Sequence, residues 1–159
     1  MDTLIPLFTT TDGRISRKQW WTGTVVLILI NIALYLILSV IGLGGLLGWL
    51  SLIIYAIYFY PAWCIGLKRR QDRDNNGMDF KIMMGIYAVL TIAQAFGIGM
   101  SPTDLGNGMV VMAPAGWMMF VQFAVGIFGI YMLVQLGFLK GTPGPNSYGA
   151  DPVGHAVAA

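Results

Sequence analysis

This chain has no glutamate, and it has only one cysteine and one histidine. The single Cys64 excludes an intrachain disulfide, and its apolar neighbours predict a small buried hydrophobic side chain. Cys64 and His155 lie far apart in the sequence, so they cannot supply the ligands of a zinc site. No Ser/His/Asp set, carboxylate pair or phosphate-binding glycine loop is recognisable either. We therefore predict no catalytic residues, no metal and no cofactor, and we do not expect an enzyme.

Charged residues are also scarce, at 10%, whereas 57% of the residues are hydrophobic, above the roughly 45–50% typical of soluble domains. Four uncharged runs cover about residues 20–41, 46–67, 82–100 and 117–139. Each is close to the ~20 residues that cross a bilayer as a helix. The runs are continuous rather than alternating, which favours helices over strands. The sequence therefore predicts an all-α membrane protein, with residues 1–159 forming a single domain of four transmembrane helices.

The segments between the runs are predicted to be irregular. Glycines crowd the stretch Gly42–Gly48, which predicts a tight turn, and residues 101–116 contain proline and glycine and are predicted to form a loop. Three prolines make the tail, residues 140–159, a poor helix or central strand. No apolar stretch follows a basic start within the first fifteen residues, so we expect no cleavable signal peptide.

The basic residues predict the orientation of the four spans. Every lysine and arginine falls before the first predicted span, between the second and third, or after the fourth, and none falls in the two other connections. Because cytoplasmic segments carry the excess of Lys and Arg, both termini are predicted to be cytoplasmic. The nine residues are Arg14, Arg17, Lys18, Lys68, Arg69, Arg70, Arg73, Lys81 and Lys140.

The stretch "GLKRRQDRDNNGMDF", residues 66–80, holds seven of the chain's sixteen charged side chains. Its bases are sufficient to anchor a cytoplasmic loop on anionic headgroups. That function does not require Asp72, Asp74 and Asp79 between them. The alternation predicts fixed ion pairs, such as Asp72 with Arg69 or with an arginine of the N-terminal segment, while "DNNG" predicts a turn. Two interpretations remain open: a structural cytoplasmic cap, or a site that binds an anion.

Three polar blocks together resemble a known family: "DGRISRKQWW" (residues 12–21), "KRRQDRDNNG" (68–77) and "GFLKGTPGPNSYGADPVG" (137–154). They are similar, in this order and over nearly the whole chain, to the bacterial inner-membrane family called domain of unknown function 805. The resemblance implies location and architecture but supplies no activity. Gln71 stands where the family usually has histidine, so we expect no titrating imidazole there. The matching residues are Gly13, Arg14, Ser16, Arg17, Trp21, Lys68, Arg69, Asp72, Gly77, Gly141, Gly144, Asn146, Tyr148, Gly149, Asp151 and Pro152.

We call these three blocks the cap, because all of them fall on the predicted cytoplasmic side and are expected to pack together over the helices. The cap supplies the candidate anion-binding site. Its predicted residues are Arg14, Ser16, Arg17, Lys18, Lys68, Arg69, Arg70, Asp72, Arg73, Gly77, Asn146, Tyr148 and Asp151.

The favoured function is that of a non-enzymatic scaffold or interaction protein, whose basic face binds anionic membrane lipid, a protein partner or a second copy of the chain. A net charge of +2 gives no reason to expect nucleic acid. The alternative is a small transporter or channel component that acts as an oligomer. No Asp, Glu, Lys, Arg or His lies in a predicted span, which argues against a proton relay. Amides such as Asn31, Gln94, Gln122 and Gln135 are expected to form hydrogen bonds between helices. A third alternative, a lipid-modifying enzyme, would use Arg69, Asp72 and Arg73.

Overall fold

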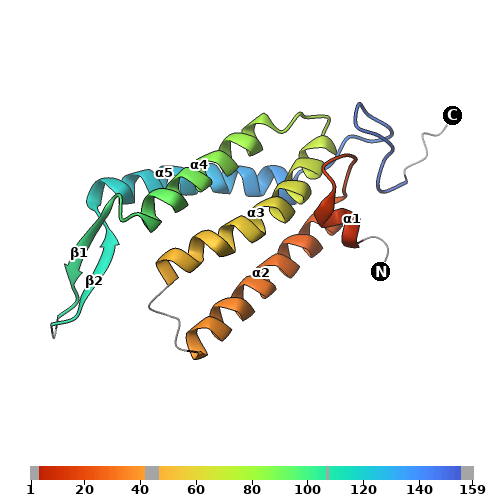
Figure 1. Ribbon diagram of the computed structural model, residues 1–159. Coiled ribbons are helices and arrows are strands. Elements are labelled where there is room, and N and C mark those ends of the chain that lie inside the picture. The colour runs from red at the N-terminus through yellow and green to blue at the C-terminus, as the bar shows by residue number, and fades with distance from the viewer. Residues whose placement is uncertain (1–3, 42–46, 107, 155–159) are drawn as a thin grey trace.

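The structure, a computed structural model, describes residues 4–41, 47–106 and 108–154. Its elements, in chain order, are the helices α1 (Leu4–Thr9), α2 (Arg17–Val40), α3 (Leu47–Gln71) and α4 (Met78–Ala95), the strands β1 (Met100–Asp104) and β2 (Val110–Pro114), helix α5 (Gly116–Leu133) and the π-helix η2 (Val134–Phe138), which continues α5 (Figure 1). The molecule is therefore mostly helical, with one hairpin of strands.

Three of these helices are long and apolar enough to cross a membrane: Arg17–Val40, Met78–Ala95 and Gly116–Phe138. Only 6%, 11% and 11% of their most apolar windows are buried inside the molecule, so most of their apolar side chains face outward. Such a surface suits lipid rather than water, which suggests a multi-pass membrane protein. Helix α3 is longer than each of the others but is not among these three, and its last turn contains three basic residues.

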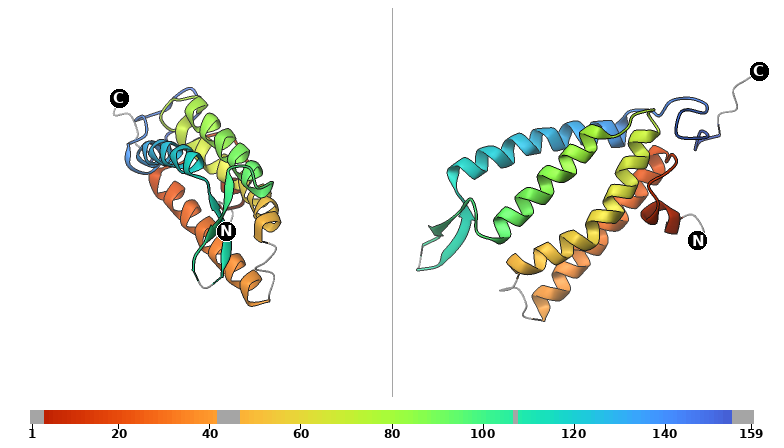
Figure 2. Two further views of the ribbon diagram at one scale, coloured as in Figure 1. Left: turned by 90° about the vertical axis from the view of Figure 1, so that its left-hand side faces the viewer. Right: turned by 45° about the horizontal axis from the view of Figure 1, so that its top comes forward.

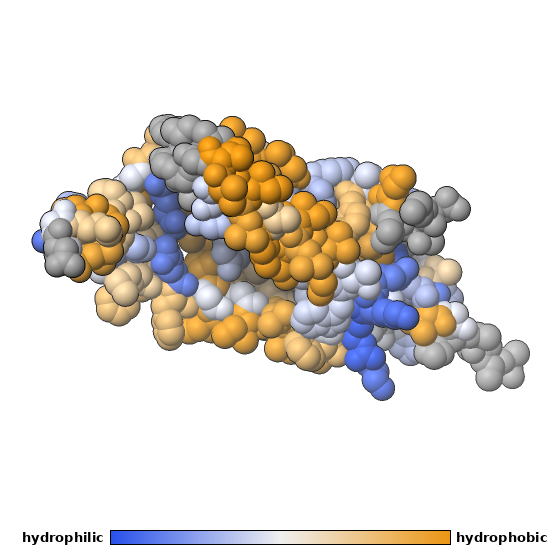
Figure 3. Space-filling model, turned by 90° about the horizontal axis from the view of Figure 1, so that it is seen from below, coloured by the Kyte–Doolittle hydropathy of each residue, from blue (hydrophilic) through white to orange (hydrophobic). Residues whose placement is uncertain are grey.

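The four long helices form two arms that meet at one end of the molecule. Helices α2 and α3 pack together, as do α4 and α5, and the two pairs separate toward the hairpin (Figures 1 and 2). The hydrophobic core lies where the arms meet, and its buried side chains include Trp20, Ile65, Phe80, Met132 and Leu136. In Figure 3 the middle of the molecule is mostly apolar, and the strongly hydrophilic residues lie toward the two ends.

The segment predicted to be a loop at residues 101–116 is mostly a β-hairpin. Strands β1 and β2 pair antiparallel, from Met100 opposite Pro114 to Asp104 opposite Val110. Between them the Asp104 carboxylate accepts a hydrogen bond from the Gly106 amide at 2.8 Å, and Gly106 has a φ of 88°, which glycine adopts readily. The third predicted span, residues 82–100, was therefore too long at its end, because α4 stops at Ala95. The prediction that the protein is all-α was wrong in this respect, since the described residues include a β-hairpin.

The charged connector is shorter than predicted. Residues 68–71 form the last turn of α3, and α4 already begins at Met78. Lys, Arg and Gln are good helix formers, so their charge does not end the helix. The helix ends at the following turn, in which Asp74 and Gly77 have positive φ angles of 54° and 69°.

The N-terminal segment contains the short helix α1, which the sequence did not predict. Helix α2 begins at Arg17 because Ser16 and Gln19 form a capping box. The fourth predicted span is continuous but changes at Val134 from α-helix to π-helix. Residues 140–154 contain no helix, as predicted. Most of the predicted turn at Gly42–Gly48, and His155, lie outside the described residues.

Candidate functional site

The three blocks of the cap meet around the side chain of Arg14. Its Nε donates to the Asp72 carboxylate at 3.1 Å, which joins the first block to the second. Its terminal nitrogens donate to the carbonyl oxygens of Thr142, Gly144 and Gly149, at 2.7, 2.6 and 3.2 Å, which joins both to the third. The predicted packing of the three blocks into one cap is thus confirmed.

Arg69 is the second guanidinium on the same carboxylate, and it is fully buried. It donates to Asp72, to the carbonyl oxygen of Leu136 at 2.7 Å and to that of Leu139. Desolvation lowers the pKa of the Arg69 guanidinium from its ordinary value, and the neighbouring Asp72 opposes that shift. The sequence predicted that Asp72 pairs with Arg69 or with an N-terminal arginine, and the structure shows both pairs.

Two guanidinium groups, those of Arg14 and Arg69, share the single carboxylate of Asp72, so this buried cluster has a net charge of about +1. The backbone of Asp72 is hydrogen-bonded as well. Its carbonyl oxygen accepts hydrogen bonds from the Thr142 amide at 2.9 Å and from the Thr142 hydroxyl at 3.1 Å. Gly141 passes so close to the Asp72 carboxylate that a Cβ atom there would collide with it. Thr142 and Gly141 hold the tail against the connector.

The C-terminal end of η2 is closed by side chains from other blocks. The carbonyl oxygens at the end of a helix lack partners within the helix. Here Trp21 Nε1 donates to the oxygen of Gly137 at 3.1 Å, and Arg17 donates to that of Phe138 at 3.1 Å. Together with Arg69, these donors bring positive charge to the negative end of a helix, which is favourable.

A third ion pair, separate from the Asp72 cluster, joins α3 to α4. Arg70 donates to both oxygens of the Asp79 carboxylate, at 3.1 and 2.7 Å, and to the side-chain oxygen of Gln135 at 2.8 Å. Arg73 donates to the same Gln135 oxygen, and the Tyr131 hydroxyl donates to Asp79 at 3.3 Å. Gln135 therefore joins two segments through its amide oxygen, as we expected of the amides in the spans. Asp79 was not among the predicted site residues, although its place among the bases was the signal for it.

The tail is fixed by its own polar side chains. Asn146 donates to the carbonyl oxygen of Gln71 at 2.9 Å and to the Thr142 hydroxyl at 2.9 Å, and its side-chain oxygen accepts from the Tyr148 amide at 2.9 Å. The Asp151 carboxylate accepts from the Gly144 amide at 3.2 Å. The bond to Gln71 attaches the irregular tail to α3, and the other contacts join tail residues to one another.

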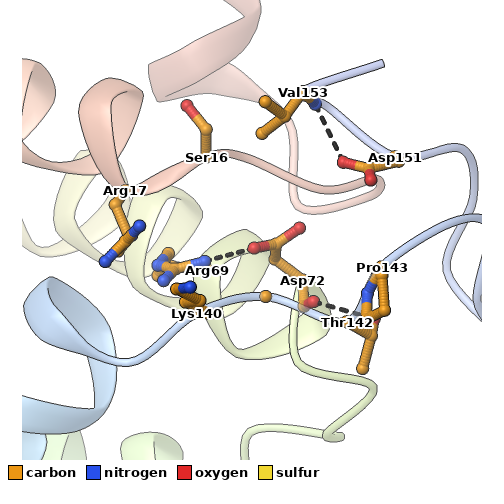
Figure 4. A pocket seen from close by; sticks show the side chains of 10 residues that line it. Ser16, Arg17, Arg69, Asp72, Lys140, Thr142, Pro143, Asp151 and Val153 are labelled. Carbon is orange, nitrogen blue, oxygen red and sulfur yellow. Dashed lines mark hydrogen bonds and ion pairs between the residues drawn. The ribbon is translucent and has the colours of Figure 1, made fainter. Parts of the chain in front are cut away.

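A polar pocket of about 400 Å³ opens within the cap. Figure 4 shows Arg17, Arg69 and Lys140 gathered at one side of it, with Asp151 at the other. Arg17 and Lys140 are exposed, and neither makes an ion pair among the described residues. They are the cations in this pocket that a ligand can reach. Lys140 was not a predicted site residue, although its position after the last apolar run placed it at this end.

Some predicted site residues lie away from the pocket. Lys18 is exposed on α2, and its side chain makes no hydrogen bond or ion pair with any described residue. Lys68 donates instead to the carbonyl oxygen of Pro6 at 2.5 Å and so attaches α1 to α3, while burial lowers the pKa of its ammonium group. Gly77 sits at the start of α4 and shapes the turn. Of the thirteen predicted residues, the pocket is thus lined only by Ser16, Arg17, Arg69, Asp72 and Asp151.

A family model for proteins of unknown function, DUF805, matches residues 8–150. The chain belongs to the DUF805 family. The match confirms the resemblance of the three blocks and covers the whole cap up to Ala150. Searches of curated proteins and of solved structures found no match. Membership of DUF805 assigns no activity, so the function rests on the geometry of the site. Among the described residues, no three metal-binding side chains of the His, Cys, Asp or Glu type lie together.

Proposed function

We propose that this chain is a four-span protein of the bacterial inner membrane with both termini in the cytoplasm, and that it is a non-enzymatic scaffold whose cap binds anionic lipid headgroups. All nine basic residues lie at the cap end, on the first turns of α2 and α4, the last turn of α3, the two connecting segments and the tail. The positive-inside rule supports a cytoplasmic cap. If α3 is counted as a span, the chain crosses the membrane four times, and all three blocks of the cap lie on the same side.

One observation carries the binding proposal: Arg17 and Lys140 line the same pocket without a carboxylate partner among the described residues. Beside them, Asp72 is already outnumbered by the guanidiniums of Arg14 and Arg69. The pocket is lined by three cations, Arg17, Arg69 and Lys140, and by two carboxylates, Asp72 and Asp151, so it has an excess of positive charge. Charge-assisted hydrogen bonds from Arg and Lys suit a phosphate group.

The same geometry supports a scaffold rather than an enzyme. Both oxygens of the Asp72 carboxylate already accept from a guanidinium, and Arg69 is fully buried behind them. A general acid or base must be able to reach the proton it transfers. Asp72 and Arg69 instead hold the cap together and leave Arg17 and Lys140 to meet the ligand.

The test compares two double variants of equal charge. Arg17→Gln with Lys140→Gln removes both pocket cations, and Lys18→Gln with Lys81→Gln removes two cations of the same end outside the pocket. Binding of phosphatidylglycerol and of phosphatidylcholine with the same chains is measured in a neutral detergent. At about 1 kcal/mol for each basic residue, we expect phosphatidylglycerol to bind about 30-fold more weakly to the first variant only. Equal losses in both variants would show charge attraction without a site and would refute the proposal.

The alternative role, a small transporter or channel component, makes the opposite prediction. It requires the amides on the helices, because a transported solute has to cross between the spans. Replacing Asn31, Gln94 and Gln122 by leucine, valine or methionine would then abolish function. The scaffold proposal expects the replacements at Gln94 and Gln122, which line neither the pocket nor the groove between the helices, to leave phosphatidylglycerol binding unchanged.

A further inference from the structure

A second hollow lies between the two arms, among α2, α3, α4 and η2, with a volume of about 410 Å³. Its lining is almost entirely apolar and includes Trp20, Leu27, Ala62, Met83 and Leu136. No charged side chain is among the residues that line it. Because it opens from the apolar outer surface of the helices, its surroundings in a membrane are lipid chains.

The size of this groove matches one acyl chain. On α2 its lining runs from Trp20 to Ile32, and twelve residues of α-helix extend for about 18 Å. The hydrocarbon core of a bilayer is ~30 Å thick, so each leaflet contributes about 15 Å. The groove therefore spans about one leaflet, starting from the cap side.

Two residues that line the groove carry buried hydroxyl groups that lack a partner. The hydroxyl oxygens of Thr24 and Tyr58 are buried without a hydrogen-bond partner. Leaving a buried hydroxyl unpaired is unfavourable, and the interior of a membrane offers no water to pair with it. An oxygen supplied by an occupant of the groove removes this cost for a hydroxyl that rotates toward it.

Thr24 lies directly below the polar pocket. It follows Arg17 by seven residues, which puts both on the same face of α2, about 10 Å apart along the axis. Between them, Trp20 and Leu136 line the cap end of the groove, and the carbonyl oxygen of Leu136 is held by Arg69. In a bilayer, the ester carbonyls of a lipid lie between its phosphate and its chains, as Thr24 lies between the pocket and the groove.

We propose that this groove holds one acyl chain of a glycerolipid from the cap-side leaflet, whose ester carbonyl accepts a hydrogen bond from the Thr24 hydroxyl. Resting on the proposed function, the same lipid places its phosphate at Arg17 and Lys140. Tyr58 is about 16 Å from Arg69 along α3 and so contacts the chain below the carbonyl. The pocket and the groove are then two parts of a single lipid site.

Thr24→Val removes the hydroxyl with almost no change in shape, and Thr22→Val is its matched control, since the Thr22 hydroxyl bonds within its own helix. Tyr58→Phe is compared with Tyr60→Phe in the same way, since the Tyr60 hydroxyl bonds to the Thr9 carbonyl. Binding of phosphatidylglycerol, phosphatidylcholine and oleate is measured for each variant, together with the unfolding temperature without lipid. We expect Thr24→Val to weaken both phospholipids about fivefold, as one lost hydrogen bond predicts, and the other three variants to change binding less than about twofold.

The unfolding temperature separates a ligand contact from a structural one. Thr24 has no internal partner to lose, so Thr24→Val is expected not to lower it. A lower unfolding temperature would overturn the proposal, as would weaker binding on Tyr58→Phe instead of Thr24→Val. Oleate that binds more tightly than either phospholipid would also overturn it, in favour of a free fatty acid.

The lipid experiment also distinguishes this inference from the proposed function. If Arg17→Gln with Lys140→Gln weakens phosphatidylglycerol while Thr24→Val changes nothing, the groove proposal fails and the headgroup site stands. If Thr24→Val weakens phosphatidylcholine and phosphatidylglycerol equally while the cationic variant has no effect, the groove stands and the headgroup site fails.

Discussion

Arg14 and Asp72, 58 positions apart in the chain, form an ion pair of 3.1 Å in which the two side chains are only 1% and 4% exposed. Because Arg14 also donates to the carbonyl oxygens of Thr142, Gly144 and Gly149, this one pair fixes the N-terminal block, the connector and the tail together. Polar contacts to one side chain therefore join all three blocks of the cap.

Asp72→Asn is expected to destabilise the folded protein strongly. The substitution leaves two buried guanidiniums without their anion, and breaking a buried pair costs about 3 kcal/mol or more. Thermal unfolding can be followed with a thiol-reactive dye, because Cys64 is the only cysteine and is fully buried. Asp74→Asn is the control: Asp74 is exposed and tolerates asparagine at its positive φ, so its effect should stay within about 1 kcal/mol. Equal effects of the two variants would contradict the role of Asp72.

Gly141→Ala tests how closely the tail packs on the connector. A Cβ at Gly141 would collide with the Asp72 carboxylate, so the unfolding temperature should fall. Gly85→Ala is the matched control, because no atom lies within 4 Å of the Cβ it would add, and alanine favours the helix by about 1 kcal/mol. An unchanged unfolding temperature for Gly141→Ala would mean that the tail does not lie against Asp72.

The Arg70–Asp79 pair is expected to show strong coupling in a double-mutant cycle. Its two parallel hydrogen bonds join α3 to α4, and the side chains are only 5% and 23% exposed. From Arg70→Gln, Asp79→Asn and the double variant, we expect a coupling energy of about 1.5–3 kcal/mol in the free energy of unfolding. The same cycle on the Lys18 and Asp12 side chains, both exposed, should give a value near zero.

The orientation proposed for the spans is tested with single cysteines. Thr103→Cys in β1 and Ser147→Cys in the tail both replace exposed residues, whereas the native Cys64 is buried and stays unreactive. A membrane-impermeant maleimide added outside intact spheroplasts should label Thr103→Cys at once and Ser147→Cys only after lysis. Labelling of Ser147→Cys before lysis would contradict the proposed orientation and would place the cap outside the cytoplasm.

The long helices could be predicted from the sequence because the apolar runs that form them contain no charge. The ends of the helices were harder to predict. The residues of "KRRQ" have a helix propensity as high as that of the apolar run before them, and α3 therefore continues to Gln71. The hairpin was missed because Pro102 and Pro114 suggested a loop, although Gly106 and Gly108 between two short stretches also fit a hairpin. The π-helix has no recognised pattern in sequence.

The candidate site was predicted in part. The alternation of acids and bases correctly predicted that Asp72 pairs with Arg69 or with an arginine of the N-terminal segment, because unlike charges in an apolar chain require pairing. The structure shows both pairs and identifies the N-terminal partner as Arg14. The roles of Gly141, Thr142 and Gln135 depend on backbone atoms of distant segments, and no local pattern encodes such contacts. Which basic residues remain unpaired, Arg17 and Lys140 in the pocket, follows only from the three-dimensional arrangement.

The most direct test of the lipid site is native mass spectrometry of the protein released gently from its own membrane. The wild-type protein is expected to retain one anionic lipid, and the variant with Arg17→Gln and Lys140→Gln is expected to lose it while the variant with Lys18→Gln and Lys81→Gln keeps it. A wild-type protein that carries no anionic lipid, or the same lipid in all three forms, would contradict the account.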